Sequence, residues 1–113
     1  MAPGPVPEVA PADAHGRAPE AVLLDVREDD EWQAGHAPGA LHMALGTLGL
    51  EYGRLPEDAP ILCVCRTGSR SERAAAALLG AGYDARNVVG GMKAWAAAGL
   101  PVVTDGGGAG AVI

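Results

Sequence analysis

The chain has 113 residues, 49% of them hydrophobic, and a formal net charge of -6 at pH 7. This length favours one domain, and the hydrophobic content excludes disorder along the whole chain. An acidic chain binds nucleic acid and anionic membrane surfaces poorly, because both need Lys and Arg to neutralise phosphates.

The expected elements alternate between strands and helices along the chain. In chain order they are strands at 6–9 and 22–26, a helix at 28–34, a strand at 40–43, a weak helix at 47–55, a strand at 60–64, a helix at 69–79, a strand at 85–89 and a helix at 91–98. Strands at 22–26 and 60–64 are almost continuously apolar, which is typical of parallel strands buried on both faces. The alternation predicts an α/β fold with a central parallel sheet flanked by helices.

The two ends of the chain differ in composition from this middle part. Residues 1–5 are small and Pro-rich, and we expect a flexible lead-in there. Residues 104–113 are Gly-rich, and we expect a flexible tail after a domain at 6–103. No signal peptide is recognisable, and no apolar run reaches the ~18 residues that span a bilayer. We therefore expect a cytoplasmic protein without membrane contact.

The segment Cys65-Arg66-Thr67-Gly68-Ser69-Arg70 joins the predicted strand at 60–64 to the predicted helix at 69–79. Sites in open α/β sheets form at the carboxyl ends of strands, where the N-terminus of the next helix attracts an anion. A thiolate is such an anion, and helix N-termini and arginines lower the pKa of a cysteine from ~8.5 to ~3.5–7.5. Gly68 allows the backbone angles of a tight anion-binding loop. The segment therefore predicts a reactive Cys65 rather than an inert buried cysteine.

Arginines gather at this segment in an otherwise acidic chain. Arg66, Arg70 and Arg73 are three of the eight Lys and Arg residues, whereas 28–31 is a run of acids. Such a local cluster indicates a small anionic ligand, although an ordinary helix start with solvated arginines is the alternative. The predicted substrate-binding residues are Arg66, Thr67, Gly68, Ser69 and Arg70.

The two cysteines form no paired zinc motif or disulfide framework, so we expect reduced thiols, no metal and no cofactor.

Several motifs resemble the rhodanese family and occur in the family's order. They are 23–28 (Leu-Leu-Asp-Val-Arg-Glu), Glu31-Trp32, 35–40 (Gly-His-Ala-Pro-Gly-Ala), the loop at 65–71, 89–92 (Val-Gly-Gly-Met), Ala94-Trp95 and 99–102 (Gly-Leu-Pro-Val). Together they cover roughly residues 6 to 103. The resemblance to single-domain rhodaneses implies a rhodanese-like central parallel sheet of about five strands with flanking helices.

The resemblance also implies an activity, that of a thiosulfate sulfurtransferase. Cys65 would be the catalytic residue: its thiolate would take a sulfane sulfur from thiosulfate or a similar small anionic donor and hold it as a persulfide. A thiol, cyanide or a protein would then accept the sulfur. The loop N–H groups would cradle the outer sulfur, and Arg66 and Arg70 would attract the donor.

Loop length separates sulfur chemistry from oxyanion chemistry. Four residues lie between Cys65 and Arg70, whereas the similar loops of arsenate reductases and dual-specificity phosphatases are one residue longer and cradle a tetrahedral oxyanion. The shorter loop favours a single sulfur atom. A phosphatase or arsenate reductase is one alternative function, and a persulfide carrier or binding module that turns over poorly with small molecules is another.

Other reactive side chains have structural interpretations. Asp25 and Arg27 predict a salt-bridged framework near the end of the sheet. His36 and His42 flank a Pro-Gly turn, and either could be a base, although a low-pKa thiolate needs none. Cys63 is expected to be buried on its strand, and a resolving thiol is the alternative, with poor disulfide geometry for residues two apart.

Overall fold

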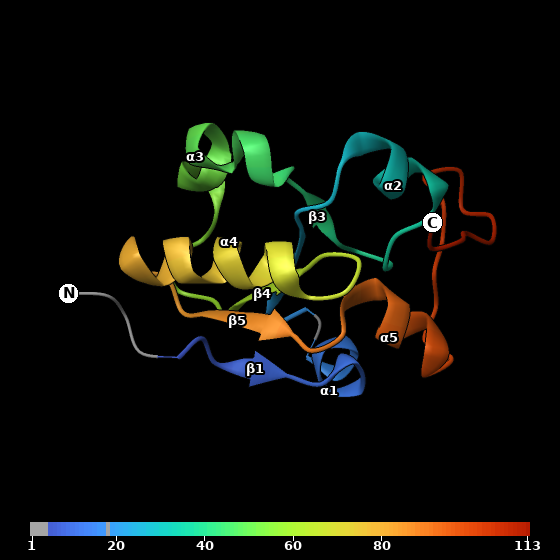
Figure 1. The fold of residues 1–113 in the computed structure, drawn as a ribbon, viewed down its shortest axis with the longest axis horizontal. Coiled ribbons are helices and arrows are strands. Elements are labelled where there is room, and N and C mark those ends of the chain that lie inside the picture. The colour runs from blue at the N-terminus through green and yellow to red at the C-terminus, as the bar shows by residue number, and fades with distance from the viewer. Residues whose placement is uncertain (1–4, 18) are drawn as a thin grey trace.

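The computed structural model describes residues 5–17 and 19–113, which form one sheet with helices on both faces (Figure 1). The five strands are parallel and lie in the order β1-β5-β4-β2-β3. They are β1 (Glu8–Val9), β2 (Val22–Asp25), β3 (Leu41–His42), β4 (Ile61–Val64) and β5 (Ala85–Val88). The predicted α/β fold, a central parallel sheet of about five strands flanked by helices, is confirmed (Figure 1). Of the predicted edge strand at 6–9 only β1 forms, since Pro7 has no N–H to donate.

The helices largely match the predicted ones. They are α1 (Pro11–Gly16), α2 (Asp29–Ala34), α3 (Leu48–Glu51), α4 (Ser69–Gly80) and α5 (Gly91–Ala97), with 3-10 turns η1 (Leu45–Thr47) and η2 (Tyr52–Arg54). The weak helix predicted at 47–55 is divided between α3 and the second 3-10 turn, consistent with its two glycines. Helix α1 was not predicted. It has six residues and buries only Ala14, so its sequence shows no apolar period.

Strand β4 lies in the middle of the sheet and determines where Cys65 is placed. All four of its residues are buried, and it pairs with β2 on one side and β5 on the other. Its side chains alternate between two cores: Ile61 and Cys63 pack on one face, Leu62 and Val64 on the other. Cys65 belongs to the same core cluster as Cys63, which also contains buried residues of α4.

The two faces of the sheet are covered by different helices (Figure 1). Helices α3 and α4 lie on the face of Cys63, where Leu48 and Leu78 enter the core. Helices α1 and α5 lie on the other face, where Ala14 and Trp95 enter the core. Small residues fill much of both cores, as expected for a chain without Phe.

The Gly-rich segment 104–113 folds back onto the domain in the structure and does not extend away from it. Val103 forms antiparallel bridges with His36 and Ala109. The N–H of Ala111 donates to the carbonyl of Ala34 at 2.9 Å. A Cβ on Gly35 would meet the Ala111 nitrogen at 2.5 Å, so glycine is needed there for close packing and not for its φ of 165°.

The other expectations concern the beginning of the chain and the membrane. Residues 1–4 of the predicted lead-in at 1–5 lie outside the described residues. Within residues 5–17 and 19–113, no helix combines the length and the apolar character needed to cross a bilayer.

Candidate active site around Cys65

Cys65 directly follows β4, and the loop that begins there turns into the N-terminus of α4. Two donors converge on its sulfur. The N–H of Gly68 lies 3.1 Å from Sγ, and the Ser71 hydroxyl oxygen lies 3.3 Å from it. Gly68 has a φ of 111°, in the left-handed region that favours glycine. Of the predicted loop residues, Gly68 thus donates to the Cys65 sulfur, together with Ser71 at the start of α4.

These donors favour the ionised form of the cysteine. Burial of the thiol raises the pKa of Cys65. Hydrogen bonds from the Ser71 hydroxyl and from the N–H groups of Ser71, Gly68 and Thr67 outweigh this effect, so the pKa of Cys65 lies below its ordinary value. Cys65 is only 1% exposed, so a reactant has to present a small protruding atom to its sulfur.

The N-terminus of α5 holds the loop through backbone hydrogen bonds. The N–H of Met92 donates to the carbonyl of Cys65 at 2.7 Å, and the N–H of Lys93 donates to the carbonyl of Arg66 at 3.0 Å. A Cβ on Gly91 would come within 2.5 Å of the Arg66 carbonyl oxygen and would also collide with that of Cys65. Glycine at this position therefore lets α5 approach the loop closely. The sequence motif at 89–92 did not by itself reveal this reason for a glycine at position 91.

Asn87 on β5 is a further residue at the loop that the sequence analysis did not identify. Its Nδ2 donates to the Gly68 carbonyl at 3.0 Å, and its Oδ1 accepts the Ser71 hydroxyl at 2.6 Å. Asn87 and Ser71 are both buried, at 4% and 0% exposure. A polar residue at a buried position of the predicted strand was the available signal, since buried polar groups need partners.

Arg70 does not donate to the sulfur but binds Glu31 on α2. Its two Nη atoms donate to the two carboxylate oxygens at 2.7 and 2.9 Å. Arg70 holds the pKa of Glu31 down to about 2, and Glu31 in turn raises the pKa of Arg70. Glu31 also accepts the N–H of Glu28 in a capping box at the start of α2. The end of the loop is thus fixed to α2.

Arg66, Thr67 and Ser69 are exposed on the outer side of the loop. Arg66 donates its Nε to the backbone oxygen of Ile113 at 3.0 Å, so the folded-back tail reaches the residue beside Cys65. An open hollow of about 330 Å³ adjoins the loop on the side of β5. It is lined by Glu8, Thr67, Gly68, Ser69, Glu72 and Asn87, among others.

The framework pair lies at the end of β2. Arg27 and Asp25 are both fully buried and share hydrogen bonds of 2.8 to 3.1 Å. Arg27 Nη2 also donates to the carbonyl of Gly35 at 2.7 Å, and this bond holds the turn after α2. His36 and His42 stack in parallel on Trp32 and are not hydrogen-bonded to Cys65. These contacts agree with a structural role, and not a catalytic one, for the Asp25–Arg27 pair and for the two histidines.

Cys63 is a free, buried thiol. Burial and the negative charge of Cys65 raise the pKa of Cys63 to about 12. A neutral buried thiol is a weak nucleophile, which argues against a resolving role.

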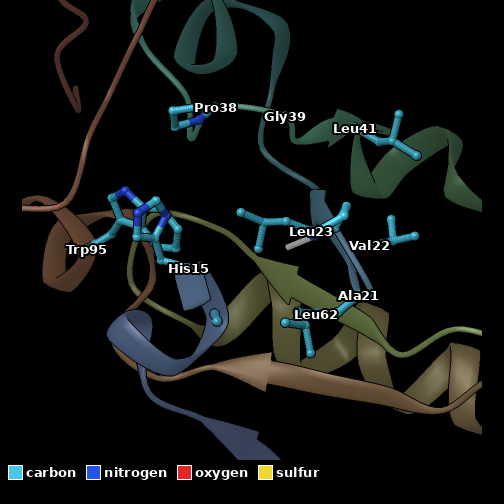
Figure 2. Close-up of a pocket in the computed structure, with 11 residues that line it drawn as sticks. His15, Ala21, Val22, Leu23, Pro38, Gly39, Leu41, Leu62 and Trp95 are labelled. Atoms are coloured by element: carbon cyan, nitrogen blue, oxygen red, sulfur yellow. The ribbon is translucent and has the colours of Figure 1, made fainter. Parts of the chain in front are cut away.

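A separate apolar pocket of about 250 Å³ lies on the opposite face of the sheet (Figure 2). Figure 2 shows His15 and Trp95 on one side of it and Leu23 on the other. Its lining includes Leu62, which packs on the face away from Cys65, and none of the predicted site residues. Among the described parts of the chain, no group of His, Cys, Asp and Glu side chains could hold a metal ion.

Known proteins resemble this chain over most of its length. The rhodanese-like domain matches residues 9–98. A sulfurtransferase from Allochromatium vinosum is 35% identical over 89 residues, or 78% of this chain and 83% of that protein. A rhodanese-related protein from Thermoplasma volcanium has a TM-score of 0.84 and 27% identity, covering 88% of this chain and 99% of its own. The polysulfide-sulfur transferase homodimer from Wolinella succinogenes has a TM-score of 0.76 and 30% identity, covering 88% and 79%.

These likenesses support sulfur transfer in general for this chain, with a sulfur donor and a sulfur acceptor as partners. The domain match covers the sheet except Glu8, the loop at Cys65, and helices α2 and α5, which hold this loop. The chain belongs to the rhodanese-like domain family.

Proposed function

We propose that this protein is a sulfurtransferase that carries a sulfane sulfur as a persulfide on Cys65, with thiosulfate or a similar small anion as donor. The observation that carries the proposal is the convergence of the Gly68 N–H and the Ser71 hydroxyl on the Cys65 sulfur, at 3.1 and 3.3 Å. Preorganised donors of this kind stabilise negative charge on the atom they face. Two free cysteines also support a reducing, cytoplasmic setting.

The reaction divides into two displacements at sulfur. In the first, the Cys65 thiolate attacks the sulfane sulfur of thiosulfate. The new S–S bond forms on Cys65, the bond between the two sulfurs of thiosulfate breaks, and sulfite leaves with the electron pair. In the second, cyanide or a thiolate attacks the outer sulfur of the persulfide. The sulfur leaves with the acceptor, and Cys65 returns as a thiolate.

The two arginines of the loop have different roles in this proposal. Arg70 is occupied by Glu31 and braces the loop against α2. Arg66 is exposed and uses one nitrogen on Ile113, so its remaining N–H groups can meet an anionic donor. Replacing Arg66 with Ala should then mainly raise the KM for thiosulfate, whereas Arg70→Ala should also lower the melting temperature. Equal melting temperatures for the two variants would contradict this division.

Intact mass spectrometry tests the proposal directly. After incubation with thiosulfate, the mass should rise by one sulfur atom, and cyanide or a thiol should remove it. Cys65→Ser should abolish the gain, while the matched variant Cys63→Ser should keep it. No adduct, or an adduct that persists in Cys65→Ser, would refute the proposal. Loading by thiosulfate with slow release to small acceptors would identify a persulfide carrier that serves a protein partner.

Loop size tests sulfur chemistry against oxyanion chemistry. A Gly inserted between Gly68 and Ser69 moves the N–H donors outward by about an ångström and widens the cradle. We expect sulfur transfer to fall by about 10²-fold, the scale of a misplaced donor set. The unmodified protein should not hydrolyse aryl phosphates, and the inserted variant should bind vanadate more tightly. Efficient phosphate hydrolysis by the unmodified protein would instead favour the phosphatase alternative.

A further inference from the structure

The hydroxyl of Ser71 has more acceptors around it than it has protons. Its Oγ lies 2.6 Å from Asn87 Oδ1, 3.2 Å from the Gly68 carbonyl oxygen and 3.3 Å from Cys65 Sγ. A serine hydroxyl donates one hydrogen bond and accepts up to two. Only one of the three neighbours can therefore receive its proton at a time, and Asn87 is the nearest.

The amide of Asn87 is fixed in the orientation that makes it an acceptor for Ser71. Its Nδ2 donates to the Gly68 carbonyl at 3.0 Å. Turning the amide over would place its oxygen against that carbonyl and its NH₂ group against Ser71. Asn87 and Ser71 are both buried, so water is not at hand to replace a lost partner.

The hydrogen-bond chain has a different arrangement for each form of Cys65. When Cys65 is a thiol, its S–H can donate to Ser71, and the Ser71 hydroxyl can donate to Asn87. When Cys65 is a thiolate, the Ser71 hydroxyl has to turn toward the sulfur, and Asn87 Oδ1 loses its donor. Ionisation of Cys65 therefore costs one buried hydrogen bond at Asn87.

We propose that Asn87 is a positioning residue that sets the protonation state of Cys65 by competing for the Ser71 proton. The proposal rests on the proposed function of Cys65 as the sulfur-carrying nucleophile. Asn87 holds the loop through Gly68 and limits how readily the thiolate forms. Apart from Cys65 itself, the charged and titratable side chains of the loop and of the elements packed against it are not hydrogen-bonded to Ser71 or Asn87. Arg66 binds Ile113, and Glu8 and Glu72 line the hollow beside Asn87. Further such groups are Arg70, paired with Glu31 from α2, the neutral Cys63 on β4, and the mutually paired Asp25 and Arg27 at the end of β2.

A double-mutant cycle on the full chain separates this role from a purely structural one. The readout is the pKa of Cys65, from the rate of iodoacetamide alkylation against pH with the modified site located by mass spectrometry. Asn87→Leu should lower the pKa of Cys65 by about half to one unit, the size of one neutral hydrogen bond. Ser71→Ala should raise it. In the Ser71→Ala background, Asn87→Leu should produce no downward shift, because the competing proton is gone.

Controls make each outcome decisive. Arg86→Ala changes the neighbouring position on β5 and should leave the pKa of Cys65 unchanged. Asn87→Ala provides a second variant if the leucine variant does not fold, as judged by its melting curve. The same downward shift in both Ser71 backgrounds, or no downward shift with Ser71 present, would overturn the proposal. Alkylation needs no sulfur donor, so the cycle can succeed even where thiosulfate loads no sulfur, and in that case only the proposed function fails.

Discussion

The ion pair between Glu31 and Arg70 should contribute measurably to stability, because it fixes the active-site loop to α2. Glu31→Gln removes the charge but keeps an oxygen for the N–H of Glu28, so the capping box is retained. The pKa of Glu31 is lowered from 4.5 to about 2, which corresponds to roughly 3 kcal/mol. The side chains of Arg70 and Glu31 are 30% and 14% exposed, and solvent screening reduces this to about 1–2 kcal/mol at pH 7.

The pH dependence of this contribution has a definite sign. A carboxyl group with a lowered folded-state pKa stabilises the fold above its unfolded pKa and loses that effect as pH falls. The contribution of Glu31 should be complete above pH 4.5 and decline toward pH 2. At pH 3 only about 40% of it should remain.

Urea unfolding of the wild type, Glu31→Gln, Arg70→Met and the double variant measures the coupling. The exposed pair of Glu51 and Arg54, separated by 3.6 Å, is a matched control and should give about 0.5 kcal/mol or less. A coupling between Glu31 and Arg70 no larger than that of the control would refute the argument. A difference between wild type and Glu31→Gln that is as large at pH 3 as at pH 7 would also refute it.

Three further predictions concern the loop and its neighbours. Alkylation of Cys65 should be half-maximal below the ordinary thiol pKa of about 8.5, since its hydrogen bonds favour the thiolate, and a higher midpoint in the pH–rate profile would contradict this. Gly91→Ala should destabilise the protein by about 2 kcal/mol or more, because its Cβ would meet two loop carbonyls, whereas Gly49→Ala, with open space around it, should not destabilise it in a thermal melt. Deletion of residues 104–113 should lower the melting temperature by only a few degrees. It should also lower the KM for thiosulfate, because Arg66 is released from its bond to Ile113. A decrease in melting temperature above about 10 °C would show that the tail is part of the core structure.

The sequence predicted the sheet and the position of the reactive loop because both depend on local patterns. The apolar run at 60–64 is typical of a strand buried on both faces, and the alanine-rich segment after Gly68 has a high helix propensity. The exit of Cys65 at a helix N-terminus follows from these two features alone. The sequence therefore located the loop, but Arg66 and Arg70, predicted to meet the donor, bind Ile113 and Glu31 in the structure.

The remaining contacts at the site join residues that are distant in the sequence. Glu31 and Arg70 are 39 positions apart, and Arg66 and Ile113 are 47 apart. The glycine-rich composition of the tail indicated flexibility, but glycine also permits close packing. A Cβ on Gly110 would approach the Cα of Gly35 at 2.7 Å, so these two positions allow the tail to lie against the turn after α2. Composition alone does not distinguish the two uses of glycine.

The nature of the donors around Cys65 is itself an argument for sulfur transfer. Its closest donors, the Gly68 N–H and the Ser71 hydroxyl, are neutral, and the charge of Arg70 is already balanced by Glu31. A full positive charge against the sulfur would lower the pKa further, but the nucleophilicity of a thiolate falls with its pKa. The cysteine of a sulfur carrier first attacks the donor and later departs as a thiolate when the acceptor attacks the persulfide, so a pKa near the working pH serves both steps best. Neutral donors lower the pKa of Cys65 without the larger loss of nucleophilicity that a charged partner would cause, and the proposed competition of Asn87 for the Ser71 proton limits this lowering.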